Sequence, residues 1–438
     1  MDWPLAILVL LGPVLLLMAL GMPVAFAFLA ANILGAFLFL GGVNGVYQLV
    51  ANASVSVTSF LLVPIPLFVL MGELFFHSGL ARRIFDSLDK LVGGLPGRLA
   101  YITVGGGTLF GALSGASMAN TALLGSLLVP EMTKRGYKPV LSMGPIMGSG
   151  GLAILIPPSG LAVLLGSLAH IDIGRLLIAG ILPGLVLASL YLAVIRLVVA
   201  VDPQAAPPYA VTPTPLREKL ASVAVNILPM SLVVFCVVGL ILLGLATPTE
   251  AAAFGVGSVI VLILAYGLFT FDALWRSLMG ALRVTVMALL IIVGSSTFSQ
   301  LLAFSGASNG IVGWATAFDV GPTTMVVLMF LVLMLLGMIM DQVSMLLITL
   351  PIFMPLAASL AIDPVWLGVV MMMGLEIGLI TPPFGLLLFI MLGVAPKGTT
   401  IGQVIVAGLP YVACALATAA LVIAEPALAV WLPSLIAR

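Results

Sequence analysis

Apolar segments about as long as a membrane-spanning helix follow one another along the whole chain. A helix that crosses a bilayer needs about 20 predominantly apolar residues. Here 63% of the residues are hydrophobic and only 7% are charged, whereas a soluble domain carries roughly a quarter charged residues. The net charge is zero, so bulk charge identifies no partner and we expect no nucleic-acid binding. The sequence therefore predicts an all-α polytopic membrane protein in a lipid bilayer.

Two breaks interrupt the apolar sequence within residues 111–159. The first is the Ser-Gly-Ala-Ser run at residues 114–117, and the second contains Pro157 and Pro158. Proline lacks the N–H group that a helix needs, and its ring clashes with the preceding turn. Non-helical backbone at membrane depth is tolerated only where it is buried in protein or lines a wet cavity. The two breaks therefore indicate either a binding site or a pair of kinks used for packing.

The segments around the first break are too short to span a membrane comfortably. Residues 98–130 contain two such segments, and basic residues lie at both outer ends. This pattern predicts a re-entrant hairpin that enters and leaves on one side of the membrane, with its tip at residues 114–117. Residues 139–168 are then predicted to form one helix that is broken at Pro157 and Pro158.

The second half of the chain repeats this arrangement. Pro158 and Pro383 are 225 residues apart, and each ends a Pro-Pro pair. Residues 322–355 are predicted to form a second re-entrant hairpin, and residues 364–392 a second broken helix. Corresponding breaks in two halves are the best sequence pointer to the binding site of a transporter. A coincidence of spacing and breaks is hard to attribute to packing alone.

The positive charges indicate that the two repeats are inverted. All lysines and arginines except Arg175 and Arg438 can be placed on one side of the membrane, which the positive-inside rule makes cytoplasmic. The first hairpin has basic ends, but the flanks of the second, around Asp319 and Asp363, have no lysine or arginine. We therefore expect the hairpins to enter from opposite sides, the tips to meet near the midplane, and the N-terminus to lie outside.

Five parts are expected along the chain. Residues 1–80 are predicted to hold N-terminal scaffold helices, 81–200 the first repeat, 201–220 a cytoplasmic linker, 221–303 central helices and 304–438 the second repeat. Single spanning helices are predicted at residues 4–20, 24–40, 59–76, 173–199, 223–245, 251–269, 281–304 and 401–424, with a surface helix at 82–91 and an apolar tail at 427–436.

Oxygen-bearing side chains at the breaks suggest two cation sites. Na⁺ is a hard cation and prefers oxygen ligands. The predicted sites comprise Ser114, Ser117, Asn120 and the backbone near Pro157 in the first repeat, and Asp341, Ser344, Thr381 and the backbone near Pro382 in the second. As an alternative, the serines bond to carbonyls of their own helices, and Asp341 caps the N–H groups of Val343 or Ser344.

Other polar residues are candidates for the transport path. Glu376 lies five residues before the second break, and two interpretations stay open: a proton-carrying or orienting residue, or a hydrogen-bonded packing residue. The apolar parts of both hairpins lack lysine and arginine, so an anionic substrate would be held by hydroxyls, helix N-terminal dipoles and bound cations. The candidate substrate-lining residues are Ser159, Ser296, Ser299 and Gln300.

Enzyme chemistry finds little support in the sequence. The chain has neither a His-Glu-x-x-His zinc motif nor a P-loop. Its two histidines, His77 and His170, lie near the ends of apolar runs, away from Ser114. We predict no catalytic residues, no cofactor and no metal beyond Na⁺ as a coupling ion. An intramembrane hydrolase is the alternative from another class of protein.

Five motifs are spread over the chain: Gly-Met-Pro-Val-Ala-Phe at residues 21–26, Gly-Ala-Leu-Ser-Gly-Ala-Ser at 111–117, Leu-Ile-Pro-Pro-Ser at 155–159, Thr-Leu-Pro-Ile-Phe-Met-Pro at 349–355 and Leu-Glu-Ile-Gly-Leu-Ile-Thr-Pro-Pro at 375–383. Together they resemble the large membrane subunit of TRAP (tripartite ATP-independent periplasmic) transporters. The resemblance covers essentially the full length.

The resemblance implies a fold, a function and partners. The fold would be that of an elevator-type transporter with inverted repeats and two re-entrant hairpins. The function would be Na⁺-driven import of a small organic acid, such as a dicarboxylate, a keto acid or a sialic acid, across the bacterial inner membrane. The partners would be a small four-helix membrane subunit on a separate chain and a periplasmic substrate-binding protein. The family's cation sites match the two sets of residues given above. A stand-alone ion-coupled organic anion transporter of similar fold is the alternative.

Overall fold

The computed structural model describes residues 2–93, 95–114, 117–207, 215–317 and 320–435, without the side chains of Leu61 and residues 112–114, and every regular element within them is helical. In chain order the α-helices are α1 (Trp3–Ala19), α2 (Val24–Phe39), α3 (Val43–Val57), α4 (Pro64–His77), α5 (Leu80–Val92), α6 (Arg98–Ser114), α7 (Ser117–Lys134), α8 (Pro139–Ser142), α9 (Gly144–Leu155), α10 (Gly160–Ala169), α11 (Ile173–Ala179), α12 (Ile181–Val201), α13 (Leu216–Ser222), α14 (Leu228–Leu242), α15 (Pro248–Ala265), α16 (Phe271–Phe304), α17 (Ala307–Thr316), α18 (Pro322–Gly337), α19 (Gln342–Ser359), α20 (Pro364–Ile380), α21 (Leu386–Val394), α22 (Ile401–Ala424) and α23 (Ala427–Ser434). Short 3₁₀ segments lie at Phe60–Leu62 and Pro203–Ala205, and a π-helical turn lies at Val223–Ile227.

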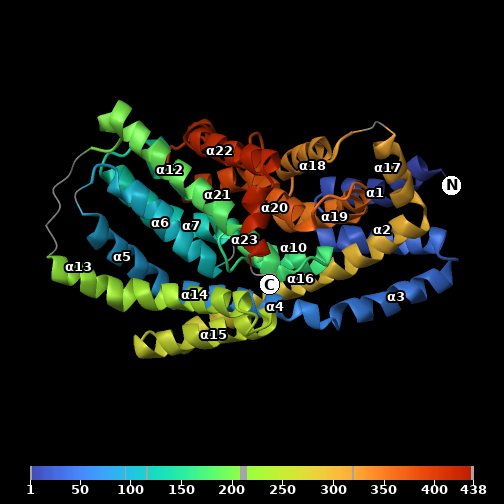
Figure 1. Cartoon of the computed structure of the whole chain (residues 1–438), viewed down its shortest axis with the longest axis horizontal. Coiled ribbons are helices and arrows are strands. Elements are labelled where there is room, and N and C mark those ends of the chain that lie inside the picture. The colour runs from blue at the N-terminus through green and yellow to red at the C-terminus, as the bar shows by residue number, and fades with distance from the viewer. Residues whose placement is uncertain (1, 94, 115–116, 208–214, 318–319, 436–438) are drawn as a thin grey trace.

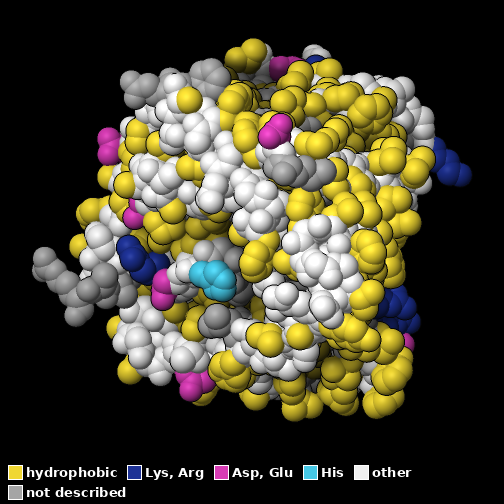
Figure 2. Space-filling model, turned by 90° about the vertical axis from the view of Figure 1, so that its right-hand side faces the viewer, with side chains coloured by type: hydrophobic (Ala, Val, Ile, Leu, Met, Phe, Trp, Pro, Cys, Tyr) yellow, Lys and Arg dark blue, Asp and Glu magenta, His cyan; other side chains and the backbone are white. Residues whose placement is uncertain are grey.

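Several of these helices are long and apolar enough to cross a membrane. Six qualify alone, and eight qualify if each of two bent pairs counts as one span. The bent pairs are α4 with α5, at 63°, and the segment Pro139–Leu155 with α10, at 44°. Figure 2 shows a side face on which apolar and uncharged side chains cover most of the surface, and charged ones are few. The predicted class, an all-α polytopic membrane protein, is confirmed.

The two repeats are visible in the helix boundaries. Helices α7 and α19 begin and end 225 residues apart, and so do the first residues of α8 and α20. Both breaks have the same local geometry, because the Pro157-Pro158 and Pro382-Pro383 peptide bonds are cis. The offset predicted from the sequence therefore relates the elements of the fold as well as the letters of the chain.

The hairpins approach the centre of the molecule from opposite ends. In Figure 1, α6 and α7 lie on the left, α18 and α19 lie on the right, and α20 lies between them. The N-terminus is at the right-hand end and the C-terminus is near the middle. This arrangement of two hairpins and two broken helices in inverted repeats is the one that the sequence predicts.

Each hairpin packs closely against its own broken helix. A Cβ atom added to Gly111 would lie 2.4 Å from the Cβ of Ala153, where α6 meets α9. A Cβ atom added to Gly378 would lie 2.8 Å from the Cα of Gly337, where α20 meets α18. Small residues let helix backbones approach closely, as is common between helices in membranes.

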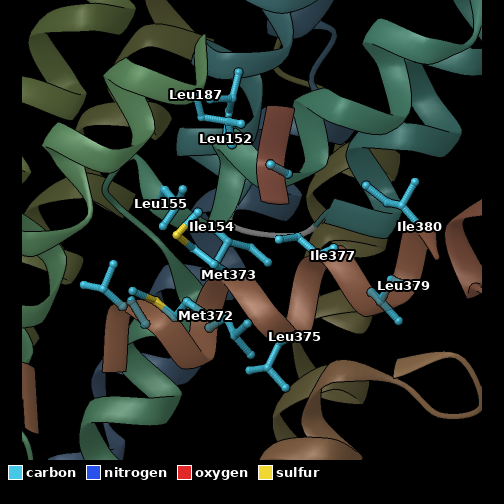
Figure 3. Close-up of a cluster of buried hydrophobic side chains, with 14 of the residues drawn as sticks. Leu152, Ile154, Leu155, Leu187, Met372, Met373, Leu375, Ile377, Leu379 and Ile380 are labelled. Atoms are coloured by element: carbon cyan, nitrogen blue, oxygen red, sulfur yellow. The ribbon is translucent and has the colours of Figure 1, made fainter. Parts of the chain in front are cut away.

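The interface between the broken helices α9 and α20 forms the middle of the core. Figure 3 shows Leu152, Ile154 and Leu155 of α9 close to side chains of α20, including Met373 and Ile377. All of these side chains are buried. The two repeats are thus joined by continuous apolar packing behind the hairpin tips.

Helix α16 runs along one edge of the molecule and contacts α2, α3 and α4. Neither α3 nor α17 is among the predicted spanning segments. Helix α3 mixes apolar residues with polar ones, and two of the polar ones bond to α16: Asn52 donates to Gln300, and the hydroxyls of Ser56 and Ser296 are 2.8 Å apart. The polar side chains that make α3 look like a loop in the sequence are therefore used in helix packing.

Ion pairs gather at the end of the molecule that holds the base of the first hairpin. Arg98 pairs with Asp89 at 2.8 Å, and Lys90 pairs with Glu218 at 3.0 Å. These pairs join α5 to the start of α6 and to α13, on the left in Figure 1. This is the end that the positive-inside rule predicts to face the cytoplasm.

Candidate functional site

Glu376 of α20 lies between the two hairpin tips and is only 3% exposed. Its Oε2 atom accepts a hydrogen bond from the Ser117 hydroxyl at 2.8 Å and another from the Gln342 side-chain amide at 2.6 Å. Ser117 is the first residue of α7 and Gln342 is the first residue of α19, 225 residues later. Corresponding residues of the two repeats therefore donate to one carboxylate oxygen.

Glycines of α9 make the space for this carboxylate. A Cβ atom added to Gly150 would lie 2.5 Å from Glu376 Oε1, and one added to Gly151 would lie 3.5 Å from Glu376 Cγ. Gly151 is the residue 225 positions before Glu376. Within the described part of the chain, Oε1 has no hydrogen-bond partner. The carboxylate is thus held by one oxygen, and the other remains able to accept.

The first hairpin tip offers several oxygen atoms around Asn120. The Asn120 amide nitrogen lies 3.3 Å from the Gly107 carbonyl and from the Ser149 hydroxyl. Its Oδ1 atom is buried and accepts no hydrogen bond from any described residue. An amide oxygen that is free to accept is the kind of ligand that a hard cation prefers. Pro157 is buried in the facing break, whereas Ser114 ends α6 with a side chain that lies outside the described residues.

The second tip is built around the N-terminus of α19. Asp341 accepts hydrogen bonds from the backbone N–H groups of Val343 (3.0 Å) and Ser344 (3.3 Å), and also from the Ser344 hydroxyl. This is the capping geometry that the sequence offered as an alternative to cation binding. A carboxylate has about four acceptor positions, so three donors leave about one for a cation.

The facing break of the second repeat contributes less side-chain oxygen. The Thr381 hydroxyl donates to the carbonyl of Ile377 at 2.6 Å, within the last turn of α20. Pro382 is half-buried and follows directly. The Thr381 oxygen keeps its lone pairs for a further partner. Cation binding by Thr381 and by the backbone near Pro382 stays a prediction.

A cavity of about 330 Å³ separates the tips from α4 and α16. Its polar lining residues are Glu73, Ser117, Asp341 and Gln342, so the cavity unites side chains from both tips. Glu73 of α4 is paired with His77 at 3.2 Å. The remaining lining is apolar, and includes Phe68 and Met71 of α4, Leu161 of α10, and Met287, Ala288 and Ile291 of α16.

Three helices begin at this cavity. The first residues of α7, α10 and α19 are among those that line it. The first N–H groups of a helix have no partner within the helix and carry positive partial charge. Such N-termini favour anionic groups, carboxylates included. The cavity therefore combines a polar end at the tips with an apolar wall on α4 and α16.

The four predicted substrate-lining residues lie elsewhere. Ser159 caps α10 by accepting from the N–H of Ala162 at 3.3 Å, and Ser296 and Gln300 bond to α3. Ser299 is half-buried on α16. None of the four is among the described residues that line the central cavity. A role for them in substrate binding stays a prediction.

Gln342 is the main site residue that the sequence reasoning missed. It is 7% exposed and bonds directly to Glu376. The signal that could have found it is the repeat itself, because the offset of 225 applied to Ser117 leads to Gln342. Of the predicted residues, the structure brings Ser117, Asp341 and Glu376 together around the tips.

Relatives of known type match nearly the whole chain. A family model described as "Tripartite ATP-independent periplasmic transporter, DctM component" matches residues 11–428. The chain is 35% identical over 376 residues to the C4-dicarboxylate TRAP transporter large permease protein DctM of Pseudomonas aeruginosa, covering 86% of each chain. It is 32% identical over 397 residues to the 2,3-diketo-L-gulonate TRAP transporter large permease protein YiaN of Escherichia coli, covering 89% of this chain and 90% of that one.

Solved structures of transporters share the fold. The Alcanivorax borkumensis YdaH transporter superposes with a TM-score of 0.64 at 15% identity, covering 88% of this chain and 89% of the other. Neisseria gonorrhoeae MtrF superposes with a TM-score of 0.60 at 15% identity, covering 87% and 84%. At this identity the likeness concerns the fold alone. The sequence matches carry the assignment: this chain belongs to the tripartite ATP-independent periplasmic transporter family, as a large, multi-pass membrane component.

Proposed function

We propose that this chain forms the path by which a small organic anion is imported, and that it couples import to Na⁺. The observation that carries this proposal is the convergence of both hairpin tips on one central cavity. Three helix N-termini at that cavity favour a carboxylate. The tips also carry the oxygen atoms that a hard cation prefers.

Bound Na⁺ would balance the charges at the tips. Asp341 lines the cavity, and neither lysine nor arginine is present among the described lining residues. A carboxylate substrate beside Asp341 would be repelled unless a cation lay between them. Asn120 Oδ1 in the first tip and the Asp341 carboxylate in the second are the oxygens that we assign to cation binding. Glu376 would orient the two tips through its bonds to Ser117 and Gln342.

The proposed movement is of the elevator type. The tips and broken helices would move as one transport domain, because α9 and α20 are packed together behind the tips. Helices α4 and α16 would form the static wall of the cavity. Their apolar lining offers few hydrogen bonds to break when the transport domain moves past them.

The proposed assembly follows the family. The relatives are named as large permease proteins of TRAP transporters, and the family is described as tripartite. We therefore propose a small four-helix membrane subunit and a periplasmic substrate-binding protein as partners, in the bacterial inner membrane. The likeness to the YdaH and MtrF folds keeps a stand-alone transporter as the second candidate. Uptake that survives without either partner would favour that candidate.

Replacement of Asp341 by asparagine tests the coupling ion. Asparagine caps a helix about as well as aspartate, so Asp341→Asn should preserve α19 while removing the charge. We expect the Na⁺ concentration for half-maximal uptake in reconstituted vesicles to rise by about tenfold, which corresponds to about 1.4 kcal/mol of binding free energy.

Asp363 provides a matched control. It caps α20 through the N–H groups of Val365 (2.8 Å) and Trp366 (2.9 Å), away from the cavity lining. Asp363→Asn should leave the Na⁺ dependence of uptake unchanged. If Asp341→Asn also leaves it unchanged, Asp341 is not a cation ligand.

A further inference from the structure

The lining of the central cavity points to the chemical class of the substrate. We infer that this chain transports a small monocarboxylate whose body is mostly hydrocarbon. The inference rests on the proposed function, anion import through this cavity, and goes beyond it by selecting among organic acids. Relatives are named for C4-dicarboxylate, 2,3-diketo-L-gulonate and ectoine, so membership of the family does not decide the matter.

The cavity has one place for a carboxylate. The polar side chains Ser117, Asp341 and Gln342 all come from the hairpin tips, where α7 and α19 begin. Ser117, Met118 and Ala119 form the first turn of α7, and all three line the cavity. The backbone N–H groups of a first turn lack partners within the helix. A substrate carboxylate would therefore bind at the tips.

The opposite wall cannot hold a second carboxylate. Phe68 and Met71 of α4 and Ala288 and Ile291 of α16 line this wall, and all four side chains are buried. The charged group on the same side is Glu73, which is itself acidic. Within the described lining no lysine, arginine or histidine could pair with an anion there. Burying a second carboxylate against this wall would strip its hydration without replacement.

The size of the cavity also restricts the substrate. A volume of about 330 Å³ lies at the lower end of the range for small-molecule sites. At roughly 30 Å³ for each water molecule, the space corresponds to on the order of ten non-hydrogen atoms. A polyhydroxylated sugar acid would exceed this space, and its hydroxyl groups would meet apolar side chains instead of hydrogen-bond partners. A branched acid of about six carbons matches the volume and the lining.

Ligand-dependent thermal unfolding of the purified full chain tests the class directly. The probes are 4-methylpentanoate, its neutral isostere 4-methylpentanamide, and the dicarboxylate succinate, each in sodium chloride and in choline chloride. We expect 4-methylpentanoate to raise the unfolding midpoint in sodium chloride, because a ligand that binds only the folded state stabilises it. Succinate and the amide should leave the midpoint unchanged.

Two substitutions at Met287 test the wall. Met287 lines the cavity from α16 and is 59% exposed, so a long side chain can be accommodated. Met287→Arg would supply the missing partner for a second carboxylate, and we expect succinate to bind at least about tenfold more tightly than to the unmodified chain. Met287→Gln is the matched control of similar length, and it should not gain succinate binding.

The outcomes separate failure of the substrate class from failure of the proposed function. If succinate stabilises the unmodified chain as well as 4-methylpentanoate does, the monocarboxylate class is wrong and anion import stands. If the amide acts as well as the acid, the cavity is a general apolar pocket and the class is wrong. If succinate binding is the same in all three chains, the wall does not face the substrate. If no carboxylate changes the midpoint in sodium chloride, the class and the anion site both fall.

Discussion

Glu376 illustrates how much depends on single side chains in the centre of this protein. Its Oε2 atom is the common acceptor for Ser117 and Gln342, one donor from each hairpin tip. Both donors are buried. A buried donor left without an acceptor costs about 1–3 kcal/mol. Removal of this one carboxylate therefore weakens both tips at once.

A double-mutant cycle measures this dependence. Ser117→Ala should lower the free energy of unfolding in detergent by about 1 kcal/mol, because a buried hydrogen bond is lost. In a Glu376→Ala background the same substitution should cost close to nothing, because its partner is already absent. Stabilities of the four chains give a coupling energy, expected at about 0.5–3 kcal/mol for residues in contact.

Ser126→Ala is the matched control for this cycle. Ser126 lies on the same helix but is exposed, and its hydroxyl donates to the carbonyl of Leu123 at 2.9 Å. Its replacement should cost the same with and without Glu376. A cost for Ser117→Ala that is equal in both backgrounds would assign its stabilising bond to the Gly150 carbonyl, 3.1 Å away.

At the residue scale the sequence predicted candidates but not their partners. Ser117, Asn120 and Glu376 could be named because polar residues are rare in apolar sequence. The bond between Glu376 and Ser117 joins residues 259 positions apart, so only the packing of α7 against α9 and α20 reveals it. Gln342 was within reach of the sequence, because it repeats the position of Ser117.

At the scale of elements, close contact between helices depends on pairs of small residues. Helices α18 and α20 meet at Gly337 and Gly378, whose backbones leave no room for a side chain. Such contacts maximise van der Waals packing where apolar burial provides no driving force between helices in lipid. The second hairpin is therefore held to its broken helix by shape.

Gly378→Ala should loosen this contact. The added Cβ atom would lie 2.8 Å from the Cα of Gly337, so the helices must separate. Overpacking of this kind typically costs about 1–3 kcal/mol. We expect a lower thermal unfolding midpoint in detergent and slower uptake in vesicles.

Gly257→Ala on α15 is the matched helical control. A Cβ atom at Gly257 meets nothing within 4 Å, and alanine favours a helix over glycine by about 1 kcal/mol. The midpoint should therefore stay level or rise. Equal losses for both substitutions would show that the Gly337–Gly378 contact is not special.

The elements themselves were predictable to different extents. The Pro-Pro pairs fixed both broken helices, and the short apolar segments fixed both hairpins, because these features act locally on the backbone. The boundaries of α22 were predicted to the residue. Helix α3 was missed because its composition is that of a loop, and Asn52 and Ser56 find their partners only on α16.

At the scale of the whole molecule, the two hairpins enter from opposite ends and meet in the middle (Figure 1). Their bases are therefore separated by the full depth of the fold, although their tips share one carboxylate. Apolar length alone could not have shown this, because a re-entrant hairpin and a pair of spanning helices have similar composition. The charge at the two bases supplied the difference.

Sided labelling of single cysteines tests this topology. Lys134 ends α7, Ser359 ends α19, and both are exposed. In a chain with Cys236→Ser and Cys414→Ala, a membrane-impermeant maleimide should label Ser359→Cys in intact cells. It should label Lys134→Cys only after the membrane is opened, because basic loops stay in the cytoplasm.

Arg82→Cys serves as a second marker for the cytoplasmic end. Arg82 lies on α5, which joins the base of the first hairpin through the Arg98–Asp89 ion pair. It should behave like Lys134→Cys. Labelling of Lys134→Cys and Ser359→Cys from the same side would contradict the inverted arrangement of the hairpins.

The single carboxylate between the tips has a consequence for cooperativity. Glu376 faces Gly151, its counterpart in the other repeat, so the pair of repeats has one negative charge to share. An ion that draws Ser117 or Gln342 toward itself alters the acceptor on which the other depends. Binding free energies at two sites that share a group are reciprocally coupled. Two Na⁺ sites joined in this way would fill together, and the Na⁺ dependence of uptake would be sigmoidal.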